Sequence, residues 1–221
     1  GMMVMVSSAD LLTLYLGTEL MSLSLYVMAG LKRSEPRSLE ASAKYFVLGA
    51  FSSGILLYGI SLLYGATGST SLPEIAAAIS GRNLDDPLLL FATILLTVGF
   101  GFKLAVVPFH MWTPDVYQGA PTSVTAFMAV ASKAASFGAF LRVFMEGLGG
   151  LKANWSAMFL LLCLATLILG NILALVQTNV KRMLAYSSIA HAGYALIGVV
   201  ATGHMENSSG IASVLLYLSL Y

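Results

Sequence analysis

The stretch GFKLAVVPFHMW, residues Gly101–Trp112, combines a lysine, a proline and a histidine inside one of the most apolar parts of the chain. Pro108 has no backbone N–H, so the carbonyl of Leu104 loses its helical partner. Non-helical backbone at membrane depth is tolerated only where protein buries it or where it lines a wet cavity. Because Lys103 directly precedes Leu104, the stretch predicts a proline-broken membrane helix with a polar pocket around a titratable amine. A kink kept only for packing is the alternative.

The composition of the chain indicates that this stretch lies in a lipid bilayer. Hydrophobic residues make up 58% of the 221 residues and charged residues 10%, and the mean hydropathy is +0.86. An average soluble domain carries about a quarter charged residues. Several apolar runs reach the roughly 20 residues that a helix needs to cross a bilayer. We therefore predict an all-α, polytopic transmembrane helical bundle that forms a single transmembrane domain over residues 1–221.

The small net charge and the single cysteine exclude several classes of protein. A net charge of +1 gives no sign of a nucleic-acid partner. Cys163 lies in the apolar run MFLLLCLATLILG, which indicates packing and excludes an internal disulfide framework. The sequence has no paired cysteines of a metal site, and GFGFK lacks the spacing of a phosphate-binding loop. We expect no cofactor, no metal and no redox or hydrolytic centre within this chain.

Polar and turn-forming segments divide the apolar sequence into six full spans. Asp86 before Pro87 is typical of a helix N-cap followed by proline at the first helical position. Residues 73–79 are expected to form one or two surface helical turns, and HMWTPDVYQGAP a polar, aromatic re-entry segment. The chain stops inside the apolar run SVLLYLSLY, which predicts a piece of a longer protein. The expected spans are Asp10–Gly30, Leu39–Gly65, Pro87–Val107, Pro121–Glu146, Trp155–Val176 and Met183–Thr202, with the tail of another at Gly1–Ser8 and the start of another from Ile211.

The distribution of basic residues predicts the orientation of these spans. Alternation places the loop after Gly30, the Trp112–Gly119 segment and the Gln177–Arg182 turn on one side of the membrane. This side carries more lysine and arginine than the other, so the positive-inside rule makes it cytoplasmic. The basic residues are Lys32, Arg33, Arg37, Lys181 and Arg182 on this side, and Arg82, Lys152 and Arg142 on the other.

Three ionisable residues lie well inside predicted spans, where a charge costs about 2.5–3.5 kcal/mol on insertion scales. They are Glu19 in YLGTELMSLSLY, Lys103, and Lys133 in AVASKAASF. Such residues usually face the interior of a bundle and mark paths for ions or protons. A static ion pair between Glu19 and one lysine, which only orients the helices, is the alternative. Three charges of mixed sign on three helices favour a relay.

Three further residues are candidates for the same path. Lys44 lies a turn or two from the start of its span, where it either snorkels to the interface or joins the buried charges. His110 follows Lys103 by seven residues, so two helical turns would stack them about 10 Å apart, a gap that one or two waters bridge. His191 in SSIAHAGYAL lies near Tyr186 and is either a packing residue or a relay member.

Longer motifs carry a resemblance to a known family. They are GFKLAVVPFHMWTPDVYQGAPTSVTAFMAVASKAASF, GTELMSLSLYVMAG, SLEASAKYFVLGAFSSGILLYG and QTNVKRMLAYSSIAHAGY, and together they extend over nearly all 221 residues. In these motifs the chain resembles the antiporter-like membrane subunits of respiratory complex I, the NADH–quinone oxidoreductase of bacteria. TPDVYQGAPT together with ASKAA is most similar to the subunit N group of this family.

The resemblance implies a fold and a set of site residues. The fold would be a helical array with two inverted five-helix repeats and broken helices, and this piece would hold the end of the fourth helix through the start of the eleventh. A second broken helix, with a lysine near the proton exit, would lie beyond Tyr221. The implied site residues are Glu19 as the acidic residue of the fifth helix, Lys103 of the broken seventh, Lys133 as the central lysine of the eighth, His110 and Tyr186 in the hydrophilic axis, and Lys44 with a less settled role.

The resemblance also implies partners and a location. NADH, FMN, iron–sulfur clusters and quinone would be bound by the rest of the complex. The partners would be its other membrane subunits and the lipid bilayer. The chain would lie in the bacterial inner membrane as a multi-pass protein, with the Lys32–Arg37 and Lys181–Arg182 loops in the cytoplasm.

These observations lead to one functional hypothesis and two alternatives. Quinone reduction elsewhere in the complex would bias the Glu19–Lys103 pair, and a proton would pass by Lys103, water and His110 to Lys133. A subunit of a multisubunit Na⁺/H⁺ antiporter or of a membrane-bound hydrogenase is the first alternative, because these share the lysine at the helix break and the glutamate. TPDVYQGAP argues against it, and genes for NADH–quinone subunits beside this one would exclude it. A purely structural membrane module is the second, which mutants that assemble but fail to pump would exclude.

Overall fold

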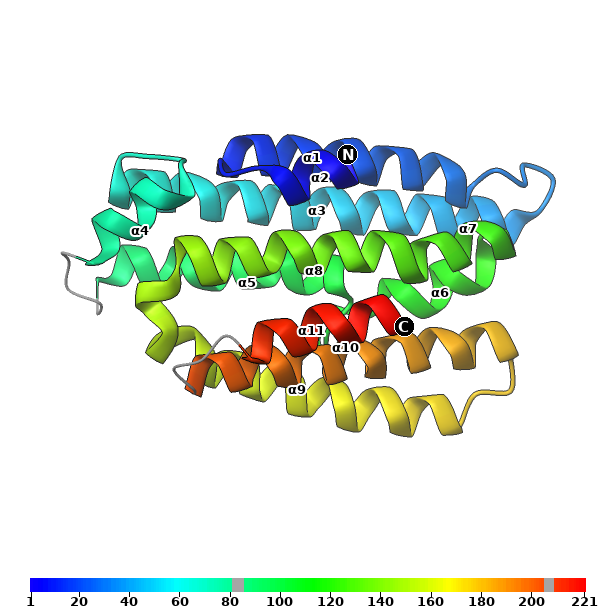
Figure 1. The fold of residues 1–221 in the computed structure, drawn as a ribbon. Coiled ribbons are helices and arrows are strands. Elements are labelled where there is room, and N and C mark those ends of the chain that lie inside the picture. The colour runs from blue at the N-terminus through cyan, green and yellow to red at the C-terminus, as the bar shows by residue number, and fades with distance from the viewer. Residues whose placement is uncertain (81–85, 205–208) are drawn as a thin grey trace.

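Apolar runs form long helices in the computed structural model of the protein, which describes residues 1–80, 86–204 and 209–221 (Figure 1). Six helical segments in these ranges are long and apolar enough to cross a membrane, which confirms the expected number of full spans. All helices and helical turns in the described ranges are, in chain order, α1 (Met2–Ser7), α2 (Leu11–Ala29), α3 (Pro36–Thr67), α4 (Leu72–Ser80), α5 (Pro87–Leu104), α6 (Trp112–Gly119), α7 (Thr122–Phe127), the π-helical turn η1 (Met128–Ser132), α8 (Lys133–Leu141), a second π-helical turn η2 (Arg142–Gly147), the 3₁₀ turn η3 (Gly149–Leu151), α9 (Lys152–Leu175), α10 (Val180–His204) and α11 (Ser209–Leu220).

Aspartates set the start of two of the spans. The Asp10 carboxylate accepts hydrogen bonds of 2.9 and 3.0 Å from the second and third N–H groups of α2, which have no helical partner. Asp86 accepts one of 2.9 Å from the N–H of Leu88, and Pro87 is the first residue of α5. The N-cap expected at Asp86 is therefore confirmed.

The short helix expected between two of the spans is α4, and it is packed against the bundle rather than lying free on the surface. Its residues Leu72, Ile75 and Ile79 are buried. Leu72 contacts Gly147 of η2 and Ile79 contacts Gly150 of η3, close enough that a Cβ at either glycine would lie 2.9 Å from the facing side chain. α4 is thus a surface helix as expected, with Pro73, Glu74 and Ala77 exposed, and its buried face closes one end of the bundle.

The long helices run side by side along one direction (Figure 1). α1, α2 and α3 form one side, α5 and α8 the middle, and α9, α10 and α11 the other side. The loop after α2, the helix α6 and the turn between α9 and α10 share one end, at the right of the view, as the alternation predicted. Lys152, the first residue of α9, lies at the opposite end, and Arg82 lies outside the described residues.

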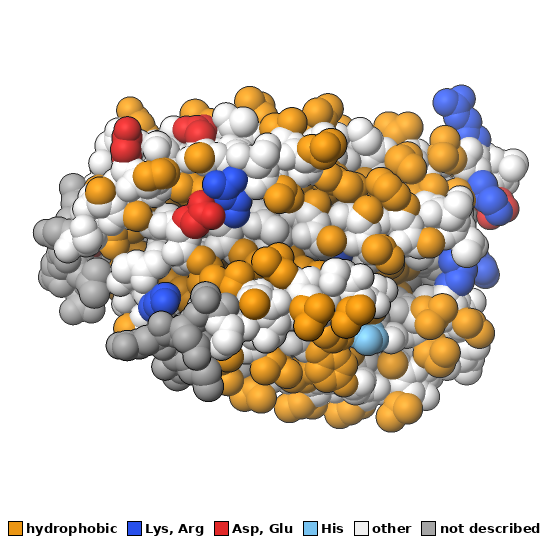
Figure 2. Space-filling view, viewed as in Figure 1, with side chains coloured by type: hydrophobic (Ala, Val, Ile, Leu, Met, Phe, Trp, Pro, Cys, Tyr) orange, Lys and Arg blue, Asp and Glu red, His pale blue; other side chains and the backbone are white. Residues whose placement is uncertain are grey.

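Hydrophobic side chains cover much of the visible surface between the two ends, and lysine and arginine side chains gather at the right-hand end (Figure 2). Large apolar residues such as Phe51 of α3, Leu161 of α9 and Ile172 of α9 are exposed in the isolated chain. An exposed apolar surface of this extent is typical of a protein surrounded by lipid or by neighbouring membrane subunits.

Glycines allow the long helices to approach closely. A Cβ at Gly99 of α5 would lie 2.6 Å from the Cβ of Leu56 in α3, and a Cβ at Gly170 of α9 would lie 2.9 Å from the backbone nitrogen of Ala190 in α10. Membrane helices associate without a hydrophobic driving force between them, so small residues that permit close packing are favoured at their contacts. These contacts fix α5 against α3 and α10 against α9.

Candidate functional site

The broken helix ends before the residue that was expected to break it. α5 stops at Leu104, short of the predicted end at Val107. Ala105 adopts a left-handed conformation with φ of 58°, and its N–H donates to the carbonyl of Phe102 at 3.1 Å. A left-handed residue directly after the last helical residue is a common helix end. The chain therefore leaves the helix ahead of Pro108.

Protein groups bury the non-helical backbone that follows. The N–H of Val107 donates to Oγ1 of Thr166 in α9 at 3.0 Å, and the indole N–H of Trp112 donates to the carbonyl of Phe102 at 3.1 Å. The cavity of about 190 Å³ beside Pro108 is lined mostly by aliphatic and aromatic side chains. Lys103 does not line this cavity. The polar groups that contact the lysine come from α2.

Glu19 and Lys103 face each other across α2 and α5. Nζ of Lys103 lies 3.8 Å from Oε1 of Glu19, and the lysine side chain is only 4% exposed. The lysine donates a hydrogen bond of 2.7 Å to Oγ of Ser22, and Ser53 of α3 donates one to Glu19. The ion pair considered from the sequence is present. The two serines were not singled out, although Ser22 follows Glu19 by three residues and so shares its helix face.

Lys133, the first residue of α8, is the second buried lysine, with an exposed fraction of 4%. Its Nζ donates to Oγ of Ser188 in α10 at 2.6 Å and also to the Ser188 carbonyl. No carboxylate in the described part of the chain forms an ion pair with it. Unlike Lys103, this ammonium is held by neutral oxygen atoms.

A π-helical turn, η1, lies directly before Lys133, and the second, η2, follows α8. Such turns are rare and are frequent at functional sites. Oγ of Ser132 donates to the carbonyl of Met128 at 2.6 Å, a bond of the kind that bends helices. The sequence predicted one span over Pro121–Glu146, which is confirmed as Thr122–Gly147, and it did not predict the two turns within this span. Ser132 alone could not have indicated the first turn, because Ser22 makes the same kind of bond within the regular helix α2.

His110 lies in the non-helical segment after the break. Its expected stacking on Lys103 along two helical turns is wrong, because α5 ends at Leu104. The His110 ring lies 6.4 Å, centroid to centroid, from the ring of Tyr186 in α10. No hydrogen bond within the described residues joins Lys103, His110 and Lys133 to one another. Proton transfer among them would therefore need bridging water.

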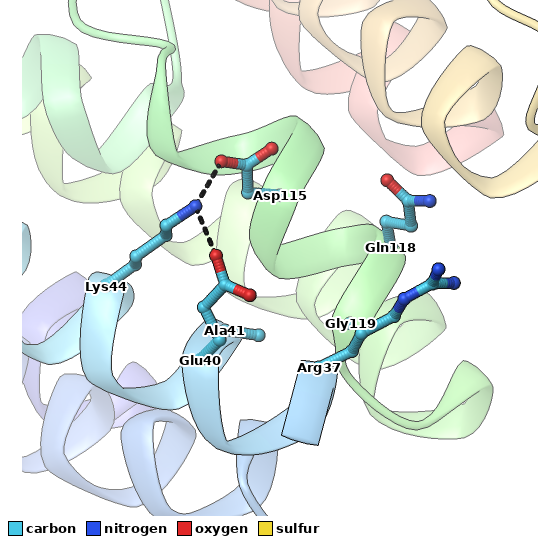
Figure 3. Close-up of a pocket in the computed structure, with 7 residues that line it drawn as sticks. All are labelled: Arg37, Glu40, Ala41, Lys44, Asp115, Gln118 and Gly119. Carbon is cyan, nitrogen blue, oxygen red and sulfur yellow. Dashed lines mark hydrogen bonds and ion pairs between the residues drawn. The ribbon is translucent and has the colours of Figure 1, made fainter. Parts of the chain in front are cut away.

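Lys44 lies at the charged end of the bundle and not beside the buried lysines. Its Nζ lies 2.7 Å from Oε1 of Glu40 and 2.9 Å from Oδ2 of Asp115, and Figure 3 shows the three side chains pointing toward one another from α3 and α6. Arg182 Nη1 of α10 lies 2.5 Å from the other Asp115 oxygen. The Lys44 side chain is 43% exposed, which favours the interface position over a buried one.

Asp115 is a functional candidate that the sequence analysis missed. It lies in the first turn of α6, in the stretch that the sequence predicted as a polar, aromatic re-entry segment without naming a helix. Burial acts to raise the pKa of the Asp115 carboxyl, but hydrogen bonds from Lys44 and Arg182 outweigh it and hold the pKa below its ordinary value. The carboxylate is therefore charged at neutral pH and ties α6 to both α3 and α10. An acidic residue after Pro114 was a helix-start signal that could have found it.

His191 lies one helical turn after Ser188 on α10. Its Nδ1 is 2.5 Å from the hydroxyl oxygen of Tyr217 in α11. His191 and Ser188 both line a cavity of about 390 Å³, which Lys181 at the charged end also lines. The sequence left two roles open for His191, packing and membership of the relay. The histidine lies close to Ser188, the hydrogen-bond partner of Lys133.

The sequence that carries these residues matches a known family. A family model described as "NADH:quinone oxidoreductase/Mrp antiporter, TM" matches residues 8–221. The chain belongs to this family. The resemblance stated from the motifs is thereby confirmed.

Curated members of the NADH:quinone oxidoreductase/Mrp antiporter family match the whole of this chain. NADH-quinone oxidoreductase subunit N 2 of Rhizobium meliloti strain 1021 is 54% identical over 221 residues, which cover 100% of this chain and 45% of that protein. NADH-quinone oxidoreductase subunit N of Nitrosomonas europaea is 50% identical over 218 residues, which cover 99% and 45%. The chain therefore spans about half the length of the curated relatives it matches.

Solved structures of this family have the same fold. A chain of respiratory complex I from Thermus thermophilus matches with a TM-score of 0.77 and 43% identity, over 98% of this chain and 46% of that one. A chain of an archaeal membrane-bound sulfane sulfur reductase matches with a TM-score of 0.83 and 26% identity, over 97% of this chain and 43% of that one. A chain of the Mrp complex from Dietzia sp. matches with a TM-score of 0.83 and 26% identity, over 95% of this chain and 38% of that one. The predicted all-α, antiporter-like membrane fold is confirmed.

Proposed function

We propose that this chain is part of a proton-translocating membrane subunit of an NADH–quinone oxidoreductase. The identity of 50–54% to relatives named subunit N supports this assignment. The identity to the Mrp and sulfur reductase chains is 26%, although their TM-scores are slightly higher than that of the complex I chain. The backbone is therefore common to several membrane complexes, and the side chains favour the NADH–quinone branch.

The observation that carries the proposal is that the two buried lysines have unequal partners. Glu19 lies 3.8 Å from Lys103, whereas Lys133 has no carboxylate partner in the described part of the chain. A static ion pair accounts for the first lysine only, because Lys133 is held by neutral oxygen atoms and a buried charge without an opposite charge is costly. A lysine in such a place is best explained by a function that uses its proton.

The Glu19–Lys103 pair would act as the control point of the pathway. Two unit charges about 4 Å apart at an effective dielectric constant near 20 attract by about 4 kcal/mol. Opening the pair removes much of this attraction and makes the Lys103 ammonium a better proton donor. The proton would then move through water and His110, beside Tyr186, toward Lys133. Lys44, in its ion pairs with Glu40 and Asp115, would hold α6 in place at the charged end.

The redox chemistry of this enzyme would take place in other subunits. In the proposal NADH, FMN, iron–sulfur clusters and quinone are bound there, and this chain contributes proton translocation alone. Its exposed apolar surface would contact neighbouring membrane subunits and lipid in the bacterial inner membrane. The electron-transfer reaction would reach Glu19 through those neighbours.

Deleting the full-length gene from its host tests the proposal. We expect inverted membrane vesicles from the deletion strain to lose NADH-driven acidification, and the full-length gene to restore it. The Mrp-type alternative predicts another result, in which NADH-driven acidification persists and Na⁺-dependent dissipation of an imposed pH gradient disappears. That result would reject the proposal.

The proposal includes an orientation, with the Lys32–Arg37 and Lys181–Arg182 loops in the cytoplasm. In spheroplasts, Ser34→Cys should resist a membrane-impermeant maleimide, and Ser80→Cys, at the opposite end on α4, should react with it. The native Cys163 is buried and gives little background labelling. Labelling of Ser34→Cys with protection of Ser80→Cys would reverse the orientation.

A further inference from the structure

The nearest hydrogen-bond acceptor of Lys103 is a serine and not the glutamate with which it forms an ion pair. Nζ lies 2.7 Å from Oγ of Ser22 and 3.8 Å from Oε1 of Glu19. The first distance is that of a hydrogen bond, and the second exceeds the range of one. Both acceptors lie on α2, one helical turn apart. A change in the side-chain torsions of Lys103 is therefore enough to move its ammonium from Ser22 to Glu19.

The orientation of the Ser22 hydroxyl makes it a good acceptor for the ammonium. Its own hydrogen is donated to the carbonyl of Thr18 at 2.7 Å, which leaves oxygen lone pairs directed toward Lys103. Ser22 is almost completely buried, with an exposed fraction of 1%. In such surroundings a hydrogen bond to a charged group is stronger than in water.

A second serine donates a hydrogen bond to the carboxylate of Glu19. Oγ of Ser53 in α3 donates to Oε1 of Glu19, the same oxygen atom that lies nearest to Lys103. Ser53 is also buried, with an exposed fraction of 4%. Lys103 and Glu19 are thus each bound to a neutral hydroxyl group. The distance between their charged atoms is longer than it would be in a direct hydrogen bond between the two.

We propose that Ser22 and Ser53 are positioning residues that hold the Lys103–Glu19 pair slightly open. This rests on the proposed function of the pair in proton translocation. Without the Ser22 hydroxyl the ammonium turns to Glu19, the ion pair closes, and the proton is held on Lys103. Without the Ser53 hydroxyl the carboxylate is left free to bond the lysine, with the same result. Ser22 and Ser53 therefore set how easily the pair releases its proton.

The test uses the full-length protein in the assembled complex. Ser22→Ala removes one oxygen atom and is expected to lower NADH-driven pumping about tenfold, the change in equilibrium that follows from losing one hydrogen bond to a charged group. Ser53→Ala should also lower NADH-driven pumping. Ser22→Thr keeps the hydroxyl and should restore most of the rate, which a purely steric role of the position would not produce. Ser24→Ala is the matched control, because its Oγ bonds the Leu20 carbonyl on the exposed face of the same helix.

The outcomes separate this inference from the proposed function. Wild-type pumping by both Ser22→Ala and Ser53→Ala, with Lys103→Ala inactive, would overturn the positioning role and leave the function intact. A Ser22→Thr variant as slow as Ser22→Ala at equal amounts of assembled complex would also overturn it. If the Ser22→Thr variant does not assemble, the pumping rate of Ser53→Ala tests the positioning role: a wild-type rate overturns it and a lowered rate supports it. Wild-type pumping by Lys103→Ala would instead reject the proposed function.

Discussion

Lys133→Met is expected to lower NADH-driven proton pumping by about a hundredfold or more while the complex still assembles, because a single proton-transferring group contributes at least about that much. Methionine has a similar length and fills the same space beside Ser188, so packing is retained. It cannot carry a proton, however, and Lys133 has no carboxylate partner in the described part of the chain that its removal would leave unpaired. Acidification of inverted vesicles, normalised to the amount of complex, measures the effect.

Lys152→Met is the matched control for this substitution. Lys152 begins α9 at the end of the bundle opposite the basic loops, and it is partly exposed. We expect this variant to pump at the wild-type rate. Equal rates for Lys133→Met, Lys152→Met and wild type would show that the buried lysine of α8 carries no proton.

Lys103→Arg is expected to pump nearly as poorly as Lys103→Ala, with a loss of about a hundredfold or more in both. Arginine keeps the positive charge and the attraction to Glu19, so it preserves a static ion pair. It does not release its proton under physiological conditions, whereas a buried lysine does so readily. The same vesicle assay on assembled complexes distinguishes a brace, which arginine rescues, from a switch, which it does not.

Lys44→Arg provides the comparison at an ion pair that is not proposed to release a proton. Its partners Glu40 and Asp115 lie at the exposed end, where a guanidinium forms the same bonds. We expect Lys44→Arg to assemble and to pump at close to the wild-type rate. A rate for Lys103→Arg as high as that for Lys44→Arg would be incompatible with the switch.

The spans and the buried pair were predictable because their causes are local. Runs of about 20 apolar residues define helices regardless of their neighbours, and the N-cap at Asp86 depends on groups within a few residues. Glu19 and Lys103 are charges in apolar segments, and the cost of burying a charge alone predicts that opposite charges meet. The sequence therefore predicted the number of spans and an ion pair of Glu19 with one of the lysines, and the family resemblance pointed to Lys103 as the partner.

Features that depend on contacts between distant segments were not predictable. The end of α5 at Leu104 uses the left-handed Ala105, which no residue-type preference indicates, and a bond from Val107 to Thr166 of α9. The helix α6 gains ion pairs from Asp115 to two other helices. These partners are far away in sequence, and a single chain without its fold does not reveal them.

The turn η1 makes the length of its segment matter as much as its residue types. An α-helix advances about 100° per residue, and a π-helical turn accommodates one residue more than an α-helical turn. Deleting one residue from η1 would therefore let it close to an ordinary α-helical turn, with Thr122–Phe127 and Lys133 kept in nearly the same relative orientation. A deletion within α7 or α8, where no wide turn absorbs it, would instead rotate the residues on its two sides by roughly 100° relative to each other. The anchoring of the helix and the aim of the ammonium at Ser188 would then no longer be met together.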